Sequence, residues 1–126
     1  MFKKIVAGAM GALSVLNGLM MLIDGKHWYM TAPGVVSTGP FNAHFVADVG
    51  AAFLMAGLAL LARSWRGRYW LAALTGAAFL AFHALIHIAE FIVHPHDFMI
   101  SLTIVVMAAL ASWAALPSKG ERESHA

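Results

Sequence analysis

The sequence predicts an all-α protein, a bundle of four transmembrane helices with both termini on the cytoplasmic side. Three observations lead to this prediction. The 126 residues are 61% hydrophobic and only 11% charged, whereas soluble domains are about 25% charged. Four apolar stretches each approach the roughly 20 residues that a helix needs to cross a bilayer. Seven of the eight Lys and Arg residues fall on one side of those stretches.

The four predicted spans cover residues 5–23, 43–62, 70–93 and 98–116. They form a single membrane domain over residues 1–117, with one long outer loop at 24–42 and a tail at 118–126 predicted to be disordered. Gly25 is suited to a left-handed cap after the first span. Asn42 is a good N-cap for the second span, and Pro117 stops the fourth.

The basic residues set the predicted orientation. Only Lys26 falls on the outer side, and cytoplasmic loops of membrane proteins carry an excess of Lys and Arg. We therefore expect a multi-pass membrane protein with the bilayer as its main partner. The same positions argue against nucleic-acid binding, because the basic residues sit in short clusters beside apolar spans. The chain has no cysteine, which excludes disulfides and thiolate metal sites.

Five ionisable residues lie inside the predicted spans and are the candidate site. His83, His87 and Glu90 recur at helical spacing on one stripe of the third span. His44 and Asp48 share a face of the second span. Counting residues from the outer ends places both groups in the outer third of the bilayer. Because a charged group facing lipid costs a few kcal/mol even on lenient scales, we expect these side chains to face one another inside the bundle.

Imidazole and carboxylate groups together form a ligand set for a divalent transition metal such as Fe, Zn or Cu. We predict metal ligands at His44, Asp48, His83, His87 and Glu90. Asp48 and Glu90 are also the predicted catalytic groups, completing the metal shell or moving protons. The predicted function is a metal-dependent membrane oxidoreductase that acts on a lipophilic small molecule or a quinone.

Several alternatives stay open at this stage. Two histidines at similar depth, for instance His44 and His87, could hold a b-type haem for electron transfer, although the nearby carboxylates disfavour it. The polar residues could instead be a metal-free network or serve a metal or proton transporter. The chain could also be an accessory subunit of a larger membrane complex or a homo-oligomer. His94, His96 and Asp97 form a weaker second cluster, better explained as a solvated turn.

One segment carries a family resemblance. Pro33-Gly34-Val35 and the run Thr38-Gly39-Pro40-Phe41-Asn42, followed by His44-Phe45-Val46, Asp48-Val49-Gly50 and the later His83 and His87 pair, resembles small bacterial membrane proteins of DoxX-like layout. The resemblance implies a four-helix bundle in a bacterial inner membrane. Some DoxX-like proteins are subunits of quinone-linked oxidoreductases, and this analogy concerns the fold alone.

Overall fold

The computed structural model describes residues 1–93 and 98–123. Its long helices are α1 (Phe2–Ile23), α3 (Ala43–Trp65), α4 (Trp70–Val93) and α5 (Phe98–Ala115). Two short helices, α2 (Gly25–Thr31) and α6 (Lys119–Glu123), and two 3₁₀ turns, η1 (Val35–Thr38) and η2 (Gly67–Tyr69), complete the described part. The four long helices are apolar enough to cross a membrane. The four helices predicted for the apolar stretches are confirmed, with ends that differ by a turn or less.

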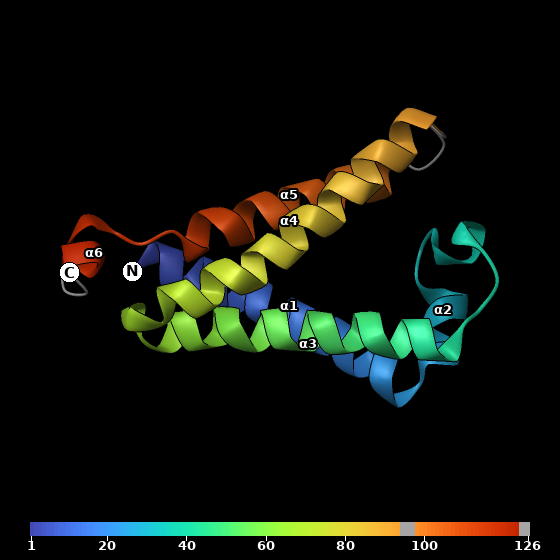
Figure 1. The fold of residues 1–126 in the computed structure, drawn as a ribbon, viewed down its shortest axis with the longest axis horizontal. Helices are drawn as coiled ribbons and strands as arrows, with labels where there is room; N and C mark the ends of the chain where they lie inside the picture. Colours follow the sequence, from blue (N-terminus) through green and yellow to red (C-terminus); the bar gives the residue numbers. More distant parts are fainter. Residues whose placement is uncertain (94–97, 124–126) are drawn as a thin grey trace.

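The start of α1, the end of α3, the start of α4 and α6 all lie at the same end of the molecule (Figure 1). We call it the basic end, because it contains Lys3, Lys4, Arg63, Arg66, Arg68, Lys119 and Arg122. The opposite end, where α3 starts and α4 finishes, is called the histidine end. The prediction that the two termini share a side agrees with this arrangement, and which side of a membrane the basic end faces stays a prediction.

α1 and α3 form the most extensive helix pair, and their backbones touch along a seam of glycines. A Cβ added to Gly18 would lie 2.6 Å from the carbonyl oxygen of Gly50. A Cβ added to Gly57 would lie 2.6 Å from the amide nitrogen of Val15. Small residues allow such close approach, which is a main source of helix association in lipid. The seam runs along most of both helices, so α1 and α3 form one hairpin.

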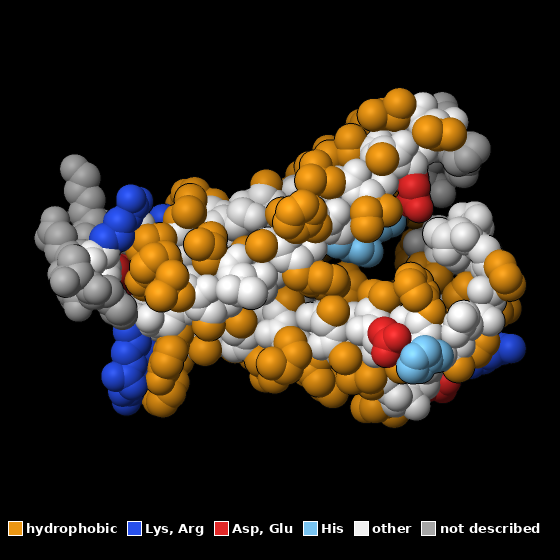
Figure 2. All heavy atoms as spheres, viewed as in Figure 1, with side chains coloured by type: hydrophobic (Ala, Val, Ile, Leu, Met, Phe, Trp, Pro, Cys, Tyr) orange, Lys and Arg blue, Asp and Glu red, His pale blue; other side chains and the backbone are white. Residues whose placement is uncertain are grey.

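α4 and α5 form the second hairpin, which joins the first through an alanine-rich core. The core comprises Ala56, Leu60, Ala73, Ala77, Leu80, Ala84, Ala108, Ala111 and Ala115. On α4 the buried residues end at Ala84, and on α5 they begin at Ala108. The hairpins are therefore packed together toward the basic end and diverge toward the histidine end (Figure 1). Figure 2 shows the resulting hollow, with histidine and acidic side chains at its edges.

The outer segment is folded against the ends of α1 and α3. The Trp28 indole donates a hydrogen bond to the Asn17 side-chain oxygen at 2.9 Å, and Tyr29 is buried. The Asn42 side chain accepts from the Phe45 amide, so the predicted N-cap is confirmed. The predicted left-handed cap at Gly25 is wrong. Asp24 instead accepts from the His27 amide and starts α2 directly, which leaves no turn for Gly25 to make.

The predicted disordered tail requires a second correction within its described part, because Lys119–Glu123 form helix α6, whereas residues 124–126 lie outside the described residues. Glu121 accepts hydrogen bonds from both the backbone amide and the hydroxyl of Ser118, at 2.7 and 2.8 Å. The bond from the Ser118 amide to the Glu121 carboxylate is one half of the capping box by which a Ser-x-x-Glu sequence starts a helix. Glu121 also binds Arg63 of α3, which fixes α6 to the bundle.

Candidate functional site

The structure divides the five predicted site residues into two groups. His83, His87 and Glu90 follow one another along α4 at the histidine end. His44 and Asp48 lie on the first two turns of α3. Their helices carry both groups at the end where the two hairpins diverge (Figure 1). Each group has its own internal contact, and the two must be described separately.

His83 points from α4 toward α3 and is surrounded by aromatic rings. Its ring centroid lies 5.2 Å from that of Phe53, with the planes at 82°, and 6.1 Å from that of Phe79, with the planes at 20°. Phe53 and Phe79 themselves meet edge to face at 5.2 Å. Such offset and edge-on arrangements are the favoured geometries of aromatic pairs. They hold the His83 imidazole at the inner limit of the hollow.

His87 and Glu90 continue the stripe outward along α4. The His87 ring lies 4.8 Å from the His83 ring, and its Nδ1 is 3.5 Å from a carboxylate oxygen of Glu90. The His87 side chain is 22% exposed and that of Glu90 is 52% exposed. Exposure is therefore greater at Glu90 than at His87, one turn before it. The predicted stripe on one face of this helix is observed, and it runs from packed aromatics to the open end.

His44 and Asp48 face away from α4. The His44 Nε2 lies 3.5 Å from Asp48 Oδ2, but the two side chains are 90% and 66% exposed. Phe53, which contacts His83, follows His44 by nine positions, and nine steps of about 100° place the two about 180° apart around α3. The glycine seam on α1 determines this rotation, since Gly50 is turned into the α1 contact. The expectation that His44 and Asp48 point into the bundle is therefore not met.

The predicted metal-ligand set is not assembled in this structure. Within residues 1–93 and 98–123, no three His, Asp or Glu side chains are close enough together to hold a metal ion. The pairs His44–Asp48 and His87–Glu90 each supply two donor groups. Metal binding by the five residues stays a prediction that requires α3 and α4 to move or another chain to contribute. The weaker candidates His94, His96 and Asp97 lie outside the described residues.

The α4 stripe has two chemical capabilities in this environment. An imidazole N–H among aromatic rings can donate a hydrogen bond to a carbonyl of a flat ligand. A neighbouring imidazole and carboxylate can also pass a proton. Leu85, Ile86, Ile92 and Val93 are exposed on the same part of α4, so this part of the helix presents apolar side chains to the bilayer.

A second charged site, absent from the sequence prediction, lies at the basic end. The Arg63 side chain is only 2% exposed, and its Nη1 and Nη2 bind the two oxygens of Glu121 at 2.6 and 3.0 Å. Nη1 also donates to the carbonyl of Gly67 at 2.9 Å. These hydrogen bonds from Arg63, assisted by those from Ser118, lower the pKa of Glu121 from its ordinary 4.5 to about 2. The Ser118-x-x-Glu121 spacing was the available sequence signal for α6.

Comparison with known proteins adds no identification. No family model, no curated protein and no solved structure matches this chain. The likeness to DoxX-like proteins therefore stays a prediction. The four apolar helices alone classify the chain as a multi-pass membrane protein.

Proposed function

We propose that this membrane protein binds a quinone or a similar flat, carbonyl-bearing lipophilic molecule in the hollow at the histidine end, as part of an oxidoreductase system. The observation that carries the proposal is the set of Phe53, Phe79, His83 and His87 rings at the inner limit of the hollow. Aromatic rings favour stacking with a quinone ring. The two imidazoles supply hydrogen-bond donors for its carbonyl oxygens.

His87 and Glu90 are suited to proton delivery in this proposal. Reduction of a quinone to a quinol takes up two electrons and two protons. The electrons come from a membrane-associated redox partner, and the contribution of this chain is to bind the ring and supply protons. In this proposal the His87–Glu90 pair, 3.5 Å apart near the end of α4, carries protons between water and the hollow. Pairs of titratable groups in such positions commonly act as proton donors and acceptors.

Binding of a short-chain ubiquinone to the purified protein tests the proposal. Calorimetric titration in detergent is expected to give saturable binding by the wild type. His83→Phe keeps an aromatic ring but removes the N–H donor, and we expect it to weaken binding about tenfold, as for loss of one hydrogen bond to a buried site. His27→Ala is the matched control, since His27 is exposed on α2. Absence of saturable binding by the wild type would reject the proposal.

A transition-metal ion held on α4 is the second candidate. The specific observation in its favour is the i, i+4 pair of imidazoles, His83 and His87, with Glu90 beside it. Fe, Zn or Cu bound there would need further ligands, and His44 or Asp48 of α3 could supply them only after a rearrangement of that helix. Elemental analysis of wild type, His87→Ala and His27→Ala decides. Loss of a stoichiometric metal in His87→Ala alone supports this candidate, and equal content in all three counts against it.

We also propose that the basic end faces the cytoplasm of a bacterial cell. The uneven distribution of Lys and Arg supports this orientation. The chain has no cysteine, so single cysteines are unambiguous reporters. Gly120→Cys lies on α6 at the basic end, and Ser37→Cys lies in η1 at the other. A membrane-impermeant maleimide applied to spheroplasts is expected to label only Ser37→Cys, and labelling of Gly120→Cys alone would reverse the orientation.

A further inference from the structure

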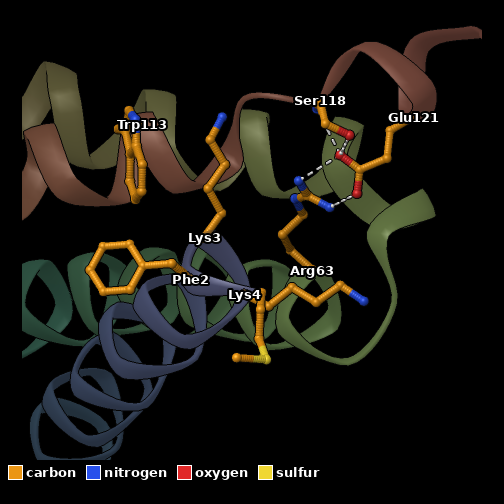
Figure 3. A pocket seen from close by; sticks show the side chains of 8 residues that line it. Phe2, Lys3, Lys4, Arg63, Trp113, Ser118 and Glu121 are labelled. Atoms are coloured by element: carbon orange, nitrogen blue, oxygen red, sulfur yellow. Dashed lines mark hydrogen bonds and ion pairs between the residues drawn. The ribbon is translucent and has the colours of Figure 1, made fainter.

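A cavity of about 310 Å³ opens at the basic end, far along the helices from the proposed quinone site. The start of α1, the ends of α3 and α5, and the segment leading into α6 surround it (Figure 3). Its lining side chains are Met1, Phe2, Lys3, Lys4, Arg63, Trp113, Ser118 and Glu121. This position is where the headgroups of a lipid bilayer meet the ends of membrane-spanning helices.

The cavity carries an excess of positive charge. Its lining has three cationic side chains and one carboxylate, and that carboxylate, Glu121, is already bound to Arg63. Lys3 donates to the carbonyl oxygen of Leu116 at 3.0 Å, a neutral acceptor. Among the residues that the structure describes, Lys3 and Lys4 form no ion pair. The charges of these two lysines are thus left for an anion from outside.

The cavity also has an apolar side. The Lys3 ammonium lies 5.3 Å from the centre of the Trp113 ring, and Phe2 meets the same ring edge-on at 5.8 Å. Figure 3 shows Phe2 and Trp113 together on one side, with Arg63 and Glu121 on the other. A ligand that fits has an anionic group for the lysines and an apolar part for the two rings. Aromatic residues favour this interfacial depth in membrane proteins.

We infer that this cavity binds the phosphate headgroup of an anionic phospholipid, with Lys3 and Lys4 supplying the charge and Phe2 and Trp113 contacting the start of the acyl chains. Basic pockets between transmembrane helices bind anionic headgroups for this reason. Lys3 and Lys4 extend from α1 in different directions (Figure 3). The two ammonium groups therefore contact the headgroup from different sides. Glu121 keeps Arg63 occupied, which leaves the lysines as the headgroup's partners. This inference is independent of the hollow at the histidine end.

Native mass spectrometry of the detergent-purified protein tests the inference. The protein is incubated with phosphatidylglycerol and phosphatidylcholine of the same acyl chains, and retention of each is compared. We expect the wild type to retain phosphatidylglycerol preferentially. The double variant Lys3→Gln/Lys4→Gln should lose about thirtyfold in that preference, since each lysine near anionic headgroups contributes about fivefold. Lys3→Arg/Lys4→Arg keeps the charge and should keep the preference.

Lys26→Gln is the matched control for net charge. Lys26 lies on α2 at the other end, over the Phe41 ring at 5.2 Å. The inference is overturned if this variant loses as much preference as a single Lys3→Gln or Lys4→Gln change. It is also overturned if the wild type retains both lipids equally. Circular dichroism confirms that each variant is folded before it is scored.

A second arm separates a lipid from a free phosphate. Inorganic phosphate is added to the wild type before phosphatidylglycerol. A lipid site predicts that the lipid is retained at phosphate concentrations equal to its own, because the Phe2 and Trp113 contacts add to the charge. Trp113→Ala should then lower lipid retention while leaving any phosphate effect unchanged. If phosphate displaces the lipid completely and Trp113→Ala has no effect, the lipid assignment is wrong.

Discussion

The two ends of this bundle differ in how far their ionisable side chains are exposed. At the basic end, Arg63 is 2% exposed and holds Glu121 through two hydrogen bonds. At the histidine end, His44 and Asp48 are 90% and 66% exposed on a helix long and apolar enough to span a membrane. The Arg63–Glu121 pair ties elements together, because separating it would leave the buried Arg63 charge without its partner. Exposed ionisable groups in apolar helices contribute little to packing and stay available for a ligand or another chain.

The packing follows the same division. The two hairpins share their alanine core toward the basic end and separate beyond Ala84 of α4. The histidine end of α3 is therefore held mainly by α1, through Gly18 and Gly50, with α2 packed beside it. The basic end is therefore the more closely packed part of the molecule. The hollow between the hairpins is the part in which ligand-dependent change is expected.

The largest effect is expected from breaking the seam at the histidine end. In Gly18→Ala the new Cβ would lie 2.6 Å from backbone atoms of both Gly50 and Leu54. Backbone atoms cannot rotate away from it as a flexible side chain can. We expect a loss of about 3 kcal/mol in unfolding free energy, as for an overpacked interior. Gly8→Ala is the control, because its nearest neighbour is the rotatable Ser64 hydroxyl at 2.8 Å. Unfolding in mixed micelles, followed by circular dichroism, measures both, and equal stability of the two variants would contradict the seam.

A smaller loss is expected from breaking the tie at the basic end. Glu121→Gln keeps the shape of the side chain but leaves the Arg63 guanidinium without a charged partner. We expect a loss of about 2 kcal/mol, in the range for hydrogen bonds to charged groups. Arg122→Ala removes an exposed charge from the same helix and is the control. The same unfolding assay applies. A Glu121→Gln protein as stable as the wild type would show that the contact between α6 and Arg63 contributes nothing to the unfolding free energy.

The Glu121 carboxylate also predicts an acid transition at the basic end. Its folded pKa is lowered to about 2 from an ordinary 4.5, so its contribution is fully present above about pH 4.5 and is lost as the pH falls toward 2. A spin label at Gly120→Cys should stay immobile at pH 5 and become mobile between pH 4 and 2. The Cβ at position 120 meets no other atom within 4 Å, so the substitution fits. A label that is already mobile at pH 5, or an acid transition that persists in Glu121→Gln, would mean that a group other than the Glu121 carboxylate causes the transition.

The smallest effect is expected from the exposed pair of α3. His44→Ala and Asp48→Asn remove groups that are not part of the packed interior. Each should change the unfolding free energy by less than about 0.5 kcal/mol. A loss several times larger would mean that these side chains are covered in the working protein. The oligomeric state, measured by light scattering, would then be expected to change together with stability.

Hydropathy and turn chemistry predicted most of the fold. The four spans, the Asn42 cap and the stripe of His83, His87 and Glu90 follow from local patterns that need no knowledge of helix rotation. The convergence of His44 and Asp48 on that stripe depended on the rotation of α3. It was inferred from the cost of charge in lipid, whereas the glycine contacts with α1 decide it. Gly50 lies two positions after Asp48, about 200° around the helix, so the glycines already indicated the orientation.

Arg63 illustrates the other limit of sequence reasoning. The sequence indicates only that Arg63 is one of several basic residues that set the membrane orientation, because arginine is common at the end of a span. Its partner is 58 positions later in the chain, in a segment whose composition is typical of a solvated tail. No local pattern joins the two. Only the Ser118-x-x-Glu121 spacing, a helix-start signal, indicated that this segment would be ordered.

The two-hairpin architecture has a consequence for how the protein is made. Each hairpin consists of helices that follow one another in the chain, so the ribosome delivers α1 and α3 complete before α4 leaves the exit tunnel. Fragments 1–66 and 67–126 each hold one hairpin, and co-expression of the two should reconstitute the bundle without a covalent link through η2. Docking of two preformed units, rather than any connecting segment, would then set the width of the space between them.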